Sequence, residues 1–305
     1  MRFPAPLRLI LALAFAATPR SLRAQSPDSA RVGYTAAQCP SCAEWNASHA
    51  PRRVFGNVYY VGTNGLSAIL ITSPDGHVLL DAGLPESASQ IAANIRALVF
   101  RVEDVRLILN SHAHYDHAGG IAALQRLSGA RVAASPSSAP VLEHGTPGAD
   151  DPQYGIALPY PVVRAVQRIR DGETLHVGPL ALTAHFTPGH TPGGTSWSWR
   201  SCEGSRCLDF VYADSQTPVS ADGFSFAHNA TYPTVLADFA RSFAVLEGLK
   251  CDVLITPHPG ASRLWERLSA SGGDAAPAFV DTTACRRYAA AARTQLERRL
   301  ETERK

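Results

Sequence analysis

The chain's most constraining feature is the segment 111–117, SHAHYDH, which places three histidines and one aspartate close together. In extended backbone alternate side chains point the same way, so His112 and His114 can converge on one metal ion. Asp116 and His117 follow where an apolar strand should turn into a helix, and they can reach a second metal beside the first. Imidazole and carboxylate are ligands that Zn²⁺ accepts, whereas Mg²⁺ and Ca²⁺ favour oxygen alone. The spacing therefore predicts a two-metal site.

Two further histidines occupy comparable places, each directly after an expected strand and beside Gly or Pro turns. His190 lies in TPGHTPG, and His258 lies in TPHPG. The chain then offers three ligands to each of two ions: His112, His114 and His190 to the first, and Asp116, His117 and His258 to the second. Three protein ligands leave coordination positions open, which is typical of a catalytic zinc. A structural or storage zinc site is the alternative interpretation.

Residues 1–24 have the pattern of a secretory signal peptide, in which arginines flank the start of an apolar run and small residues follow it. Cleavage after Ala16 and cleavage after Ala24 both fit, and we take Ala24 as the boundary. The run is shorter than the roughly 20 apolar residues that a transmembrane helix needs. We therefore expect a single mature domain over 25–305, located in the periplasm, with no membrane anchor after cleavage.

The charge balance argues against a nucleic-acid partner. The whole chain has a formal net charge of +2, and removal of residues 1–24 takes away four arginines and no acid, which leaves −2. Nucleic-acid binding needs a basic surface, which this chain lacks. We expect a small-molecule substrate and a monomer.

Six cysteines form an even set, which in a secreted protein favours disulfides over free thiols. The expected pairs are Cys202–Cys207 across a short turn, Cys251–Cys285 from the start of a strand to the last helix, and, by elimination, Cys39–Cys42. Closing the Cys251–Cys285 loop is worth roughly 3 to 4 kcal/mol. A zinc ribbon or a thioredoxin-like redox pair is the competing interpretation of Cys39 and Cys42, although no second CxxC accompanies it.

Alternating strand and helix signals indicate one α/β domain without repeats or linkers. Strands are expected over 57–63, 67–72, 77–81, 106–110, 174–176, 180–186, 195–199, 209–212 and 252–256, with a further strand and helix from 131. Helices are expected over 86–100, from about 117, over 234–249 and over 284–304. The loop over 150–161 is rich in Asp, Gly and Pro and should border a binding cleft. The charges of the last helix predict a solvated face.

These motifs resemble those of the metallo-β-lactamases, specifically of subclass B3. The resemblance runs from Trp45 through the last helix and includes LDAG at 80–83, SHAHYDHAGG at 111–120, GHTPG at 189–193, YADS at 212–215 and TPHPGA at 256–261. The HxHxDH pattern also occurs in thioesterases and lactonases of the same fold. Subclass B3 is favoured by ADS at 213–215, where other subclasses have a zinc-binding cysteine, and by His117 beside Asp116.

The resemblance implies a four-layer αβ/βα sandwich, in which two mixed β-sheets pack face to face with helices outside. It also implies a zinc-dependent β-lactamase that binds two Zn²⁺ per chain. Such an enzyme opens the ring amide of penicillins, cephalosporins and carbapenems with a metal-bridging hydroxide, which gives antibiotic resistance. Metal binding lowers the pKa of water to about 7 and so supplies this nucleophile at neutral pH.

The resemblance also assigns roles to individual residues. Asp116 is expected to act in catalysis as ligand, orienting group and proton carrier, and His190 as a ligand of the zinc that polarises the lactam carbonyl. Ser215 is expected to touch metal-bound water and, together with Thr217, to lie near the antibiotic carboxylate. The remaining substrate contacts are expected from the loop that carries Gln153 and Tyr154.

Two aspartates allow alternative interpretations. Asp81 resembles the family's aspartate that positions metal ligands, and a turn-forming role is the alternative. Asp214 can be aligned with the metal-bridging aspartate of the thioesterases and lactonases. We favour the lactamase alignment, because YADS and the downstream PHPGAS fit subclass B3 better. A periplasmic lactonase or thioesterase is the alternative function, and a binding protein that keeps this fold is a third hypothesis.

Overall fold

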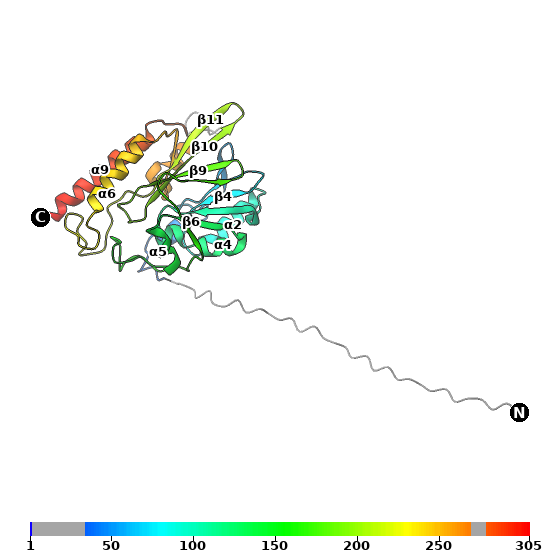
Figure 1. Ribbon diagram of the computed structural model, residues 1–305, viewed down its shortest axis with the longest axis horizontal. Coiled ribbons are helices and arrows are strands. Elements are labelled where there is room, and N and C mark those ends of the chain that lie inside the picture. Colours follow the sequence, from blue (N-terminus) through cyan, green and yellow to red (C-terminus); the bar gives the residue numbers. More distant parts are fainter. Residues whose placement is uncertain (2–33, 270–278) are drawn as a thin grey trace. The chain divides into compact units, whose positions relative to one another are not determined.

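The computed structural model describes residues 34–269 and 279–305, together with Met1. Apart from Met1, the predicted signal peptide over 1–24 lies outside the described residues. From residue 34 onward the chain forms two β-sheets with helices on their outer sides (Figure 1). None of the helices in this described part has an apolar stretch that could cross a membrane.

The first sheet has seven strands in sequence order, from β1 to β7. Their bounds are β1 Arg52–Phe55, β2 Val58–Tyr60, β3 Ile69–Ile71, β4 His77–Leu80, β5 Val105–Leu109, β6 Arg131–Ala134 and β7 Val166–Arg168. Strands β1 to β4 pair antiparallel, and β4 to β7 pair in parallel. The sheet is therefore mixed. Antiparallel neighbours can be joined by short turns, whereas parallel neighbours need longer crossover connections, which are usually helical.

The second sheet has five strands in the order β12-β11-β10-β9-β8. Their bounds are β8 Thr174–Val177, β9 Leu180–Phe186, β10 Thr195–Glu203, β11 Arg206–Tyr212 and β12 Val253–Ile255. Strands β8 to β11 form an antiparallel meander, and β12 joins β11 in parallel. This sheet is also mixed.

The two longest helices, α6 Val235–Gly248 and α9 Ala284–Glu303, lie in the second half of the described chain. The other described helices are α1 Cys42–Trp45, α2 Ser87–Ala97, α3 Tyr115–Ala118, α4 Ile121–Ser128, α5 Ser138–His144 and α7 Leu264–Ser269, with 3₁₀ turns η1 Val102–Asp104 and η2 Pro259–Ser262. Helix α3 begins at Tyr115, slightly before the predicted start. Strands β1 and β7 and helices α1 and α7 were not predicted, because segments of three to six residues carry too little periodicity.

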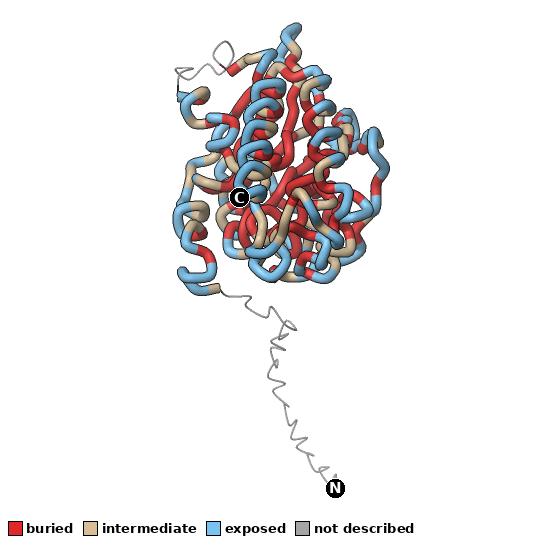
Figure 2. The backbone as a smooth tube through the Cα atoms, turned by 90° about the vertical axis from the view of Figure 1, so that its left-hand side faces the viewer, coloured by how far each residue is buried: buried red, intermediate tan, exposed pale blue. Residues whose placement is uncertain are grey.

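Three buried clusters define the layers. Leu107 and Leu109 of β5 face the core between the sheets, where they join Trp197 and Phe210 of the second sheet. Ile108 faces the opposite way, against α2 and α4. A third cluster packs β11 and β12 against α6 and α9. The order helix, sheet, sheet, helix confirms the predicted sandwich, and Figure 2 shows buried residues along the central strands and exposed ones on the outer helices.

Three disulfides are present, and they are the predicted ones. They join Cys39 to Cys42, Cys202 to Cys207 and Cys251 to Cys285. All six cysteines are therefore paired, and none of the described cysteines is a free thiol. The CxxC at 39–42 is a disulfide and supplies no metal ligand.

Candidate metal centre

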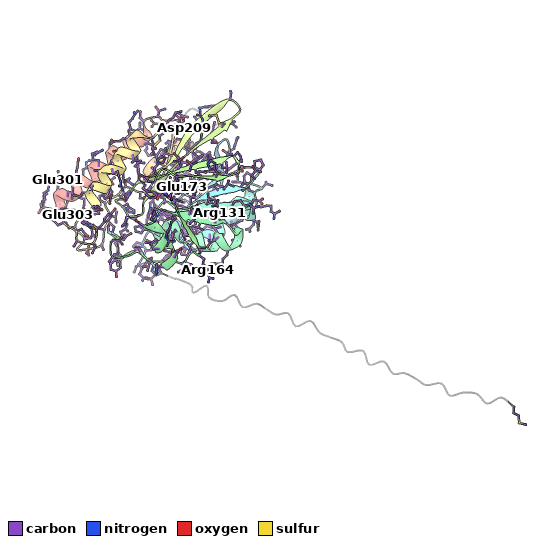
Figure 3. The ribbon with its side chains drawn as sticks, in the orientation of Figure 1. Arg131, Arg164, Glu173, Asp209, Glu301 and Glu303 are labelled. Carbon is purple, nitrogen blue, oxygen red and sulfur yellow. A yellow bond between two sulfur atoms is a disulfide. The ribbon has the colours of Figure 1, made fainter. Side chains whose placement is uncertain are left out.

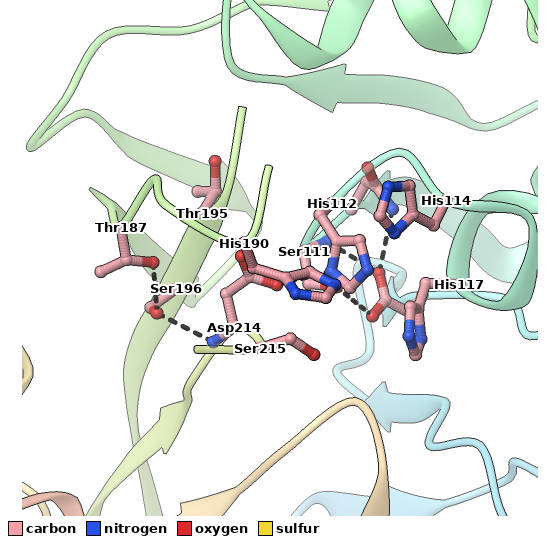
Figure 4. Close-up of polar contacts among 12 residues, drawn as sticks. Ser111, His112, His114, His117, Thr187, His190, Thr195, Ser196, Asp214 and Ser215 are labelled. Atoms are coloured by element: carbon pink, nitrogen blue, oxygen red, sulfur yellow. Dashed lines mark hydrogen bonds and ion pairs between the residues drawn. The ribbon is translucent and has the colours of Figure 1, made fainter. Parts of the chain in front are cut away.

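The six predicted ligands lie in loops or helix starts that follow strands. His112, His114, Asp116 and His117 follow β5, His190 follows β9, and His258 follows β12. Because β5 belongs to one sheet and β9 and β12 to the other, the site lies where the ends of both sheets meet. All of these side chains are buried except that of His258, which is 34% exposed. Figure 4 shows four of the imidazole rings gathered together, with Asp214 and Ser215 beside them.

The first cluster consists of His112, His114 and His190. One candidate ligand atom from each lies within 4.8 Å of the others. The second nitrogen of each ring has a protein partner: Nδ1 of His112 lies 2.7 Å from Oδ1 of Asp214, Nε2 of His114 lies 3.0 Å from Oδ2 of Asp151, and Nδ1 of His190 lies 2.8 Å from the carbonyl oxygen of Thr217. Since these nitrogens donate to oxygens, the other nitrogen of each ring presents a lone pair to the centre of the cluster.

The second cluster is built around the Asp116 carboxylate. Its Oδ2 lies 3.3 Å from Nε2 of His117 and 3.3 Å from Nε2 of His258. Nδ1 of His258 lies 3.3 Å from the carbonyl oxygen of Gly65. His112, Asp116 and His117 also form a group whose ligand atoms lie within 4.8 Å of one another, so His112 connects the two clusters.

Unpartnered ring nitrogens test whether these residues fit a metal. Nε2 of His112 and both ring nitrogens of His117 are buried and make no hydrogen bond with a described residue, although Nε2 of His117 lies 3.3 Å from Oδ2 of Asp116. Buried polar atoms are almost always hydrogen-bonded, and an orphaned one requires an explanation. A bound cation would accept the lone pairs of these imidazole nitrogens and would balance the charge of the Asp116 carboxylate beside them. The residues therefore fit a metal site.

The pKa shifts of three of the ligands, His112, His190 and Asp116, favour the forms that bind metal. Burial lowers the pKa of His112 well below its usual value. Burial, with the neighbouring rings of His112 and His114, lowers the pKa of His190 to about 3. Burial raises the pKa of Asp116, but His117 more than offsets this and holds it well below its usual range. Neutral imidazoles and an ionised carboxylate are the forms that bind metal.

A family model matches most of the region that carries this site. The model of the Metallo-beta-lactamase superfamily matches residues 61–258, a range that begins in the first sheet and ends at the last histidine of the cluster. The chain belongs to the metallo-beta-lactamase superfamily. The family is metal-dependent, so the histidine clusters are its candidate metal centre.

Solved metallo-beta-lactamases match the chain along nearly their whole length. The structure of Rm3 metallo-beta-lactamase is 60% identical, has a TM-score of 0.86 and matches over 88% of this chain and 99% of its own. The structure of MEM-A1, a subclass B3 metallo-beta-lactamase isolated from a soil metagenome library, is 50% identical, has a TM-score of 0.83 and matches over 85% of this chain and 98% of its own. The predicted resemblance to subclass B3 is confirmed.

A curated relative with another name matches more weakly. It is a hydroxyacylglutathione hydrolase of Anaeromyxobacter dehalogenans (strain 2CP-C), 33% identical over 141 residues, which are 45% of this chain and 43% of that protein. The chain thus spans less than half the length of this relative. The match is consistent with a shared superfamily.

In this member of the metallo-beta-lactamase superfamily, Asp81 holds the loop that carries the first ligands. Its carboxylate accepts hydrogen bonds from the backbone N–H of Ser111 at 2.7 Å, the Ser111 hydroxyl at 2.6 Å and the Tyr212 hydroxyl at 2.9 Å. Burial raises the pKa of Asp81 to about 6, although these donors favour the ionised form. Ser111 directly precedes His112, so Asp81 positions a ligand rather than only forming a turn.

Asp214 lies beside His112, on the side of the ring away from its unpartnered nitrogen. Its Oδ1 is bonded to Nδ1 of His112, and its backbone N–H donates to the Ser196 hydroxyl at 2.9 Å (Figure 4). Asp214 is not a member of either group of candidate metal-binding atoms among the described residues. This geometry supports a role in orienting His112 rather than in bridging two metals.

Asp151 is a buried site residue that the sequence did not reveal. It pairs with Nε2 of His114, and it also accepts a 2.8 Å hydrogen bond from the backbone N–H of Gln153. Although burial lowers the pKa of His114, Asp151 more than offsets this and raises it. The only sequence signal was its place in the Asp-rich loop over 150–161.

The predicted substrate-binding residues differ in how close they lie to the first histidine cluster. Nε2 of Gln153 lies 3.4 Å from Nδ1 of His114 and from Nε2 of His190, so its amide reaches the first cluster. Ser215 is buried beside Asp214, and Thr217 is half-buried beside His190. Tyr154 is 57% exposed and makes no hydrogen bond with another described side chain.

Proposed function

We propose that this protein is a zinc-dependent β-lactamase of subclass B3 that hydrolyses the ring amide of penicillins, cephalosporins and carbapenems. The observation that carries the proposal is the pair of adjoining three-residue clusters, joined through His112, in a chain that matches solved metallo-beta-lactamases over nearly their whole length. Three protein ligands per ion leave positions open for substrate and water.

Two zinc ions would be held by the six predicted ligands. His112, His114 and His190 would hold the first, and Asp116, His117 and His258 the second. The donor set of imidazoles and one carboxylate suits zinc better than magnesium or calcium. When bound, the two ions would supply an activated water at neutral pH and an electrophile for the lactam carbonyl.

The chain's own residues position the reacting groups and move the proton. The amide of Gln153 and the hydroxyl of Thr217 lie beside the first cluster, and together with the hydroxyl of the buried Ser215 they would orient the carboxylate of the substrate. Asp116 Oδ2, which lies between two imidazoles, would take the proton that the attacking water loses and pass it to the nitrogen released when the ring opens. Tyr154, which is exposed in the same loop as Gln153, would border the substrate.

The mature chain is proposed to work in the periplasm as a monomer. The signal-peptide pattern of residues 1–24 supports export. Three disulfides and no free thiol among the described cysteines fit an oxidising compartment. Export would bring the enzyme to the compartment that β-lactam antibiotics must cross.

A thioesterase or lactonase is the second candidate function. The curated hydroxyacylglutathione hydrolase relative favours it, but the match covers less than half of either protein. The hydrogen bond between Asp214 and His112 also weakens the alignment of Asp214 with a metal-bridging aspartate.

Hydrolysis assays test the proposal. Purified chain beginning after Ala24 is assayed with a chromogenic cephalosporin and a carbapenem, with and without a chelator, and again after zinc is added back. We expect turnover that the chelator abolishes and zinc restores, and we expect His258→Ala to lose it. His144→Ala, at an exposed histidine outside the site, is the matched control. A protein that carries two zinc ions and opens neither antibiotic, but cleaves a thioester or lactone, would favour the second candidate.

A further inference from the structure

The C-terminal end of α9 is attached by hydrogen bonds to an irregular loop. This loop contains Ser220 to Ala227 and is here called the 220–227 loop. Arg299 donates to the Ser220 hydroxyl at 2.9 Å and to the carbonyl oxygen of Phe224 at 3.1 Å. Its guanidinium also lies 5.3 Å from the ring centroid of Phe226. Arg299, a charged residue of the helix face that we predicted to be solvated, therefore binds this loop.

Glu303 completes the attachment of the 220–227 loop. Its carboxylate accepts hydrogen bonds from the backbone N–H groups of Phe226 at 3.1 Å and Ala227 at 3.0 Å, and from the Ser225 hydroxyl at 2.9 Å. Arg299 donates to the same carboxylate at 2.8 Å. Burial opposes ionisation of Glu303, but the amides of Ala227 and Phe226 more than offset it and lower its pKa. Hydrogen bonds to an ionised acceptor are stronger than neutral ones.

The 220–227 loop continues directly into the substrate side of the metal centre. It begins three residues after Thr217, whose carbonyl oxygen accepts the hydrogen bond from His190. The backbone N–H of Ala221 also donates to the carbonyl oxygen of Pro152 at 2.8 Å. Pro152 precedes Gln153, so one backbone hydrogen bond joins the two loops that carry the predicted substrate contacts.

We propose that Arg299 and Glu303 are positioning residues for substrate binding, because they hold the 220–227 loop, and through Ala221 the loop of Gln153, against the metal centre. This inference rests on the proposed β-lactamase function. Neither residue touches the metal ligands. Replacing Arg299 or Glu303 should therefore make the two loops less ordered and weaken substrate binding, while metal binding and the chemical step remain unchanged. The 220–227 loop contains no helix or strand, so without the attachment it would have to become ordered each time substrate binds. The conformational entropy lost in that ordering would weaken substrate binding.

The test compares variants within one helical turn of α9. Glu303→Gln removes the charge but keeps the shape, and Arg299→Lys keeps the charge but removes the planar fork of donors. Glu301→Gln is the matched control, because Glu301 is exposed and its side chain makes no hydrogen bond or ion pair with a described residue (Figure 3). Each variant is measured for kcat, KM, zinc content and amide hydrogen exchange over 220–228.

For Glu303→Gln and Arg299→Lys we expect KM for a cephalosporin to rise about three- to tenfold with kcat within about twofold of wild type, as for lost binding rather than lost chemistry. Exchange of the Phe226 and Ala227 amides should become faster in Glu303→Gln, and zinc content should stay unchanged. The control should match wild type in every measurement.

Several results would overturn the proposal. An unchanged KM despite faster exchange would mean that the attachment does not affect binding, and unchanged exchange would mean that Glu303 does not hold the loop. A fall in zinc content, or an equal effect of Glu301→Gln, would also contradict it. Failure of the wild-type chain to open any β-lactam is a separate outcome, which contradicts the proposed function, and the exchange comparison then still decides whether the loop is held.

Discussion

Nδ1 of His112 lies 2.7 Å from Oδ1 of Asp214, and both side chains are completely buried. Because the carboxylate accepts at Nδ1, the imidazole must present Nε2 to the metal centre. His112 belongs to both candidate metal groups, so this one hydrogen bond sets the orientation of the ring that connects them.

Removal of the Asp214 carboxylate should weaken metal binding. We expect Asp214→Ala to lower zinc affinity about 10- to 100-fold, as is typical when the outer partner of a metal-bound histidine is lost. Asp214→Asn keeps an acceptor for Nδ1 and should have a smaller effect. Zinc retained after dialysis against graded chelator measures this, with Asp222→Asn at an exposed aspartate as control. Equal zinc retention in Asp214→Ala and wild type would refute the assigned role.

A methyl group at Gly194 should destabilise the fold next to the metal centre. A Cβ there would lie 2.4 Å from Oδ2 of Asp214 and 2.6 Å from the carbonyl oxygen of Thr187. We expect Gly194→Ala to lower the free energy of unfolding by about 1 to 3 kcal/mol, the usual cost of overpacking. Gly260→Ala, where nothing lies within 4 Å of the added Cβ, is the control in urea unfolding. Equal stability of the two variants would count against the close packing at Gly194.

Two of the three disulfides should differ in their contribution to stability. Cys251 and Cys285 are separated by 34 residues, whereas Cys202 and Cys207 are separated by 5. Loop-closure entropy predicts a loss of about 3 to 4 kcal/mol when the longer loop is opened and about 2 kcal/mol for the shorter. Unfolding of the two double Cys→Ala variants measures the difference. The reverse order would show that native packing, rather than chain entropy, dominates.

Protonation of His190 should destabilise the metal-free protein in acid. The folded-state pKa of His190 is lowered from 6.5 to about 3 by burial, so the unfolded chain binds its proton first as pH falls. Burial lowers the pKa of His112 as well, so its protonation acts in the same direction. The raised pKa of His114 acts in the opposite direction, as do the carboxyls of Asp214 and Asp81, whose pKa values burial raises to about 7 and about 6. The part of the stability that neutral His190 supplies is therefore present above pH 6.5 and should be lost as pH drops toward 3, at up to about 1.4 kcal/mol per pH unit.

Urea unfolding of chelator-treated protein between pH 7.5 and 5 checks this slope. His190→Asn, which cannot titrate there, is the comparison and should show a shallower dependence on pH. If its slope equals that of wild type, His190 does not contribute to the acid sensitivity.

Residue spacing along the chain predicted an α/β domain, the disulfide pairs and the six candidate ligands, whereas the four-layer sandwich was predicted from the resemblance to the metallo-β-lactamases. The sequences of strands β3 and β5 are largely apolar because both faces of each strand are buried, one in the core between the sheets and the other against the outer helices. The short strands β1 and β7 escaped prediction, because three or four residues do not establish a period.

By itself the sequence determined which side chains could bind a metal, because SHAHYDH encodes both the ligand chemistry and the local geometry of alternate residues. Only the tertiary structure decided what holds those ligands: Asp151 on His114, Asp214 on His112, and Arg299 with Glu303 on the 220–227 loop. The physical reason is the range of the interactions. A motif records contacts between near neighbours, whereas these hydrogen bonds join residues that are far apart in the chain and meet only when both sheets and the last helix have packed.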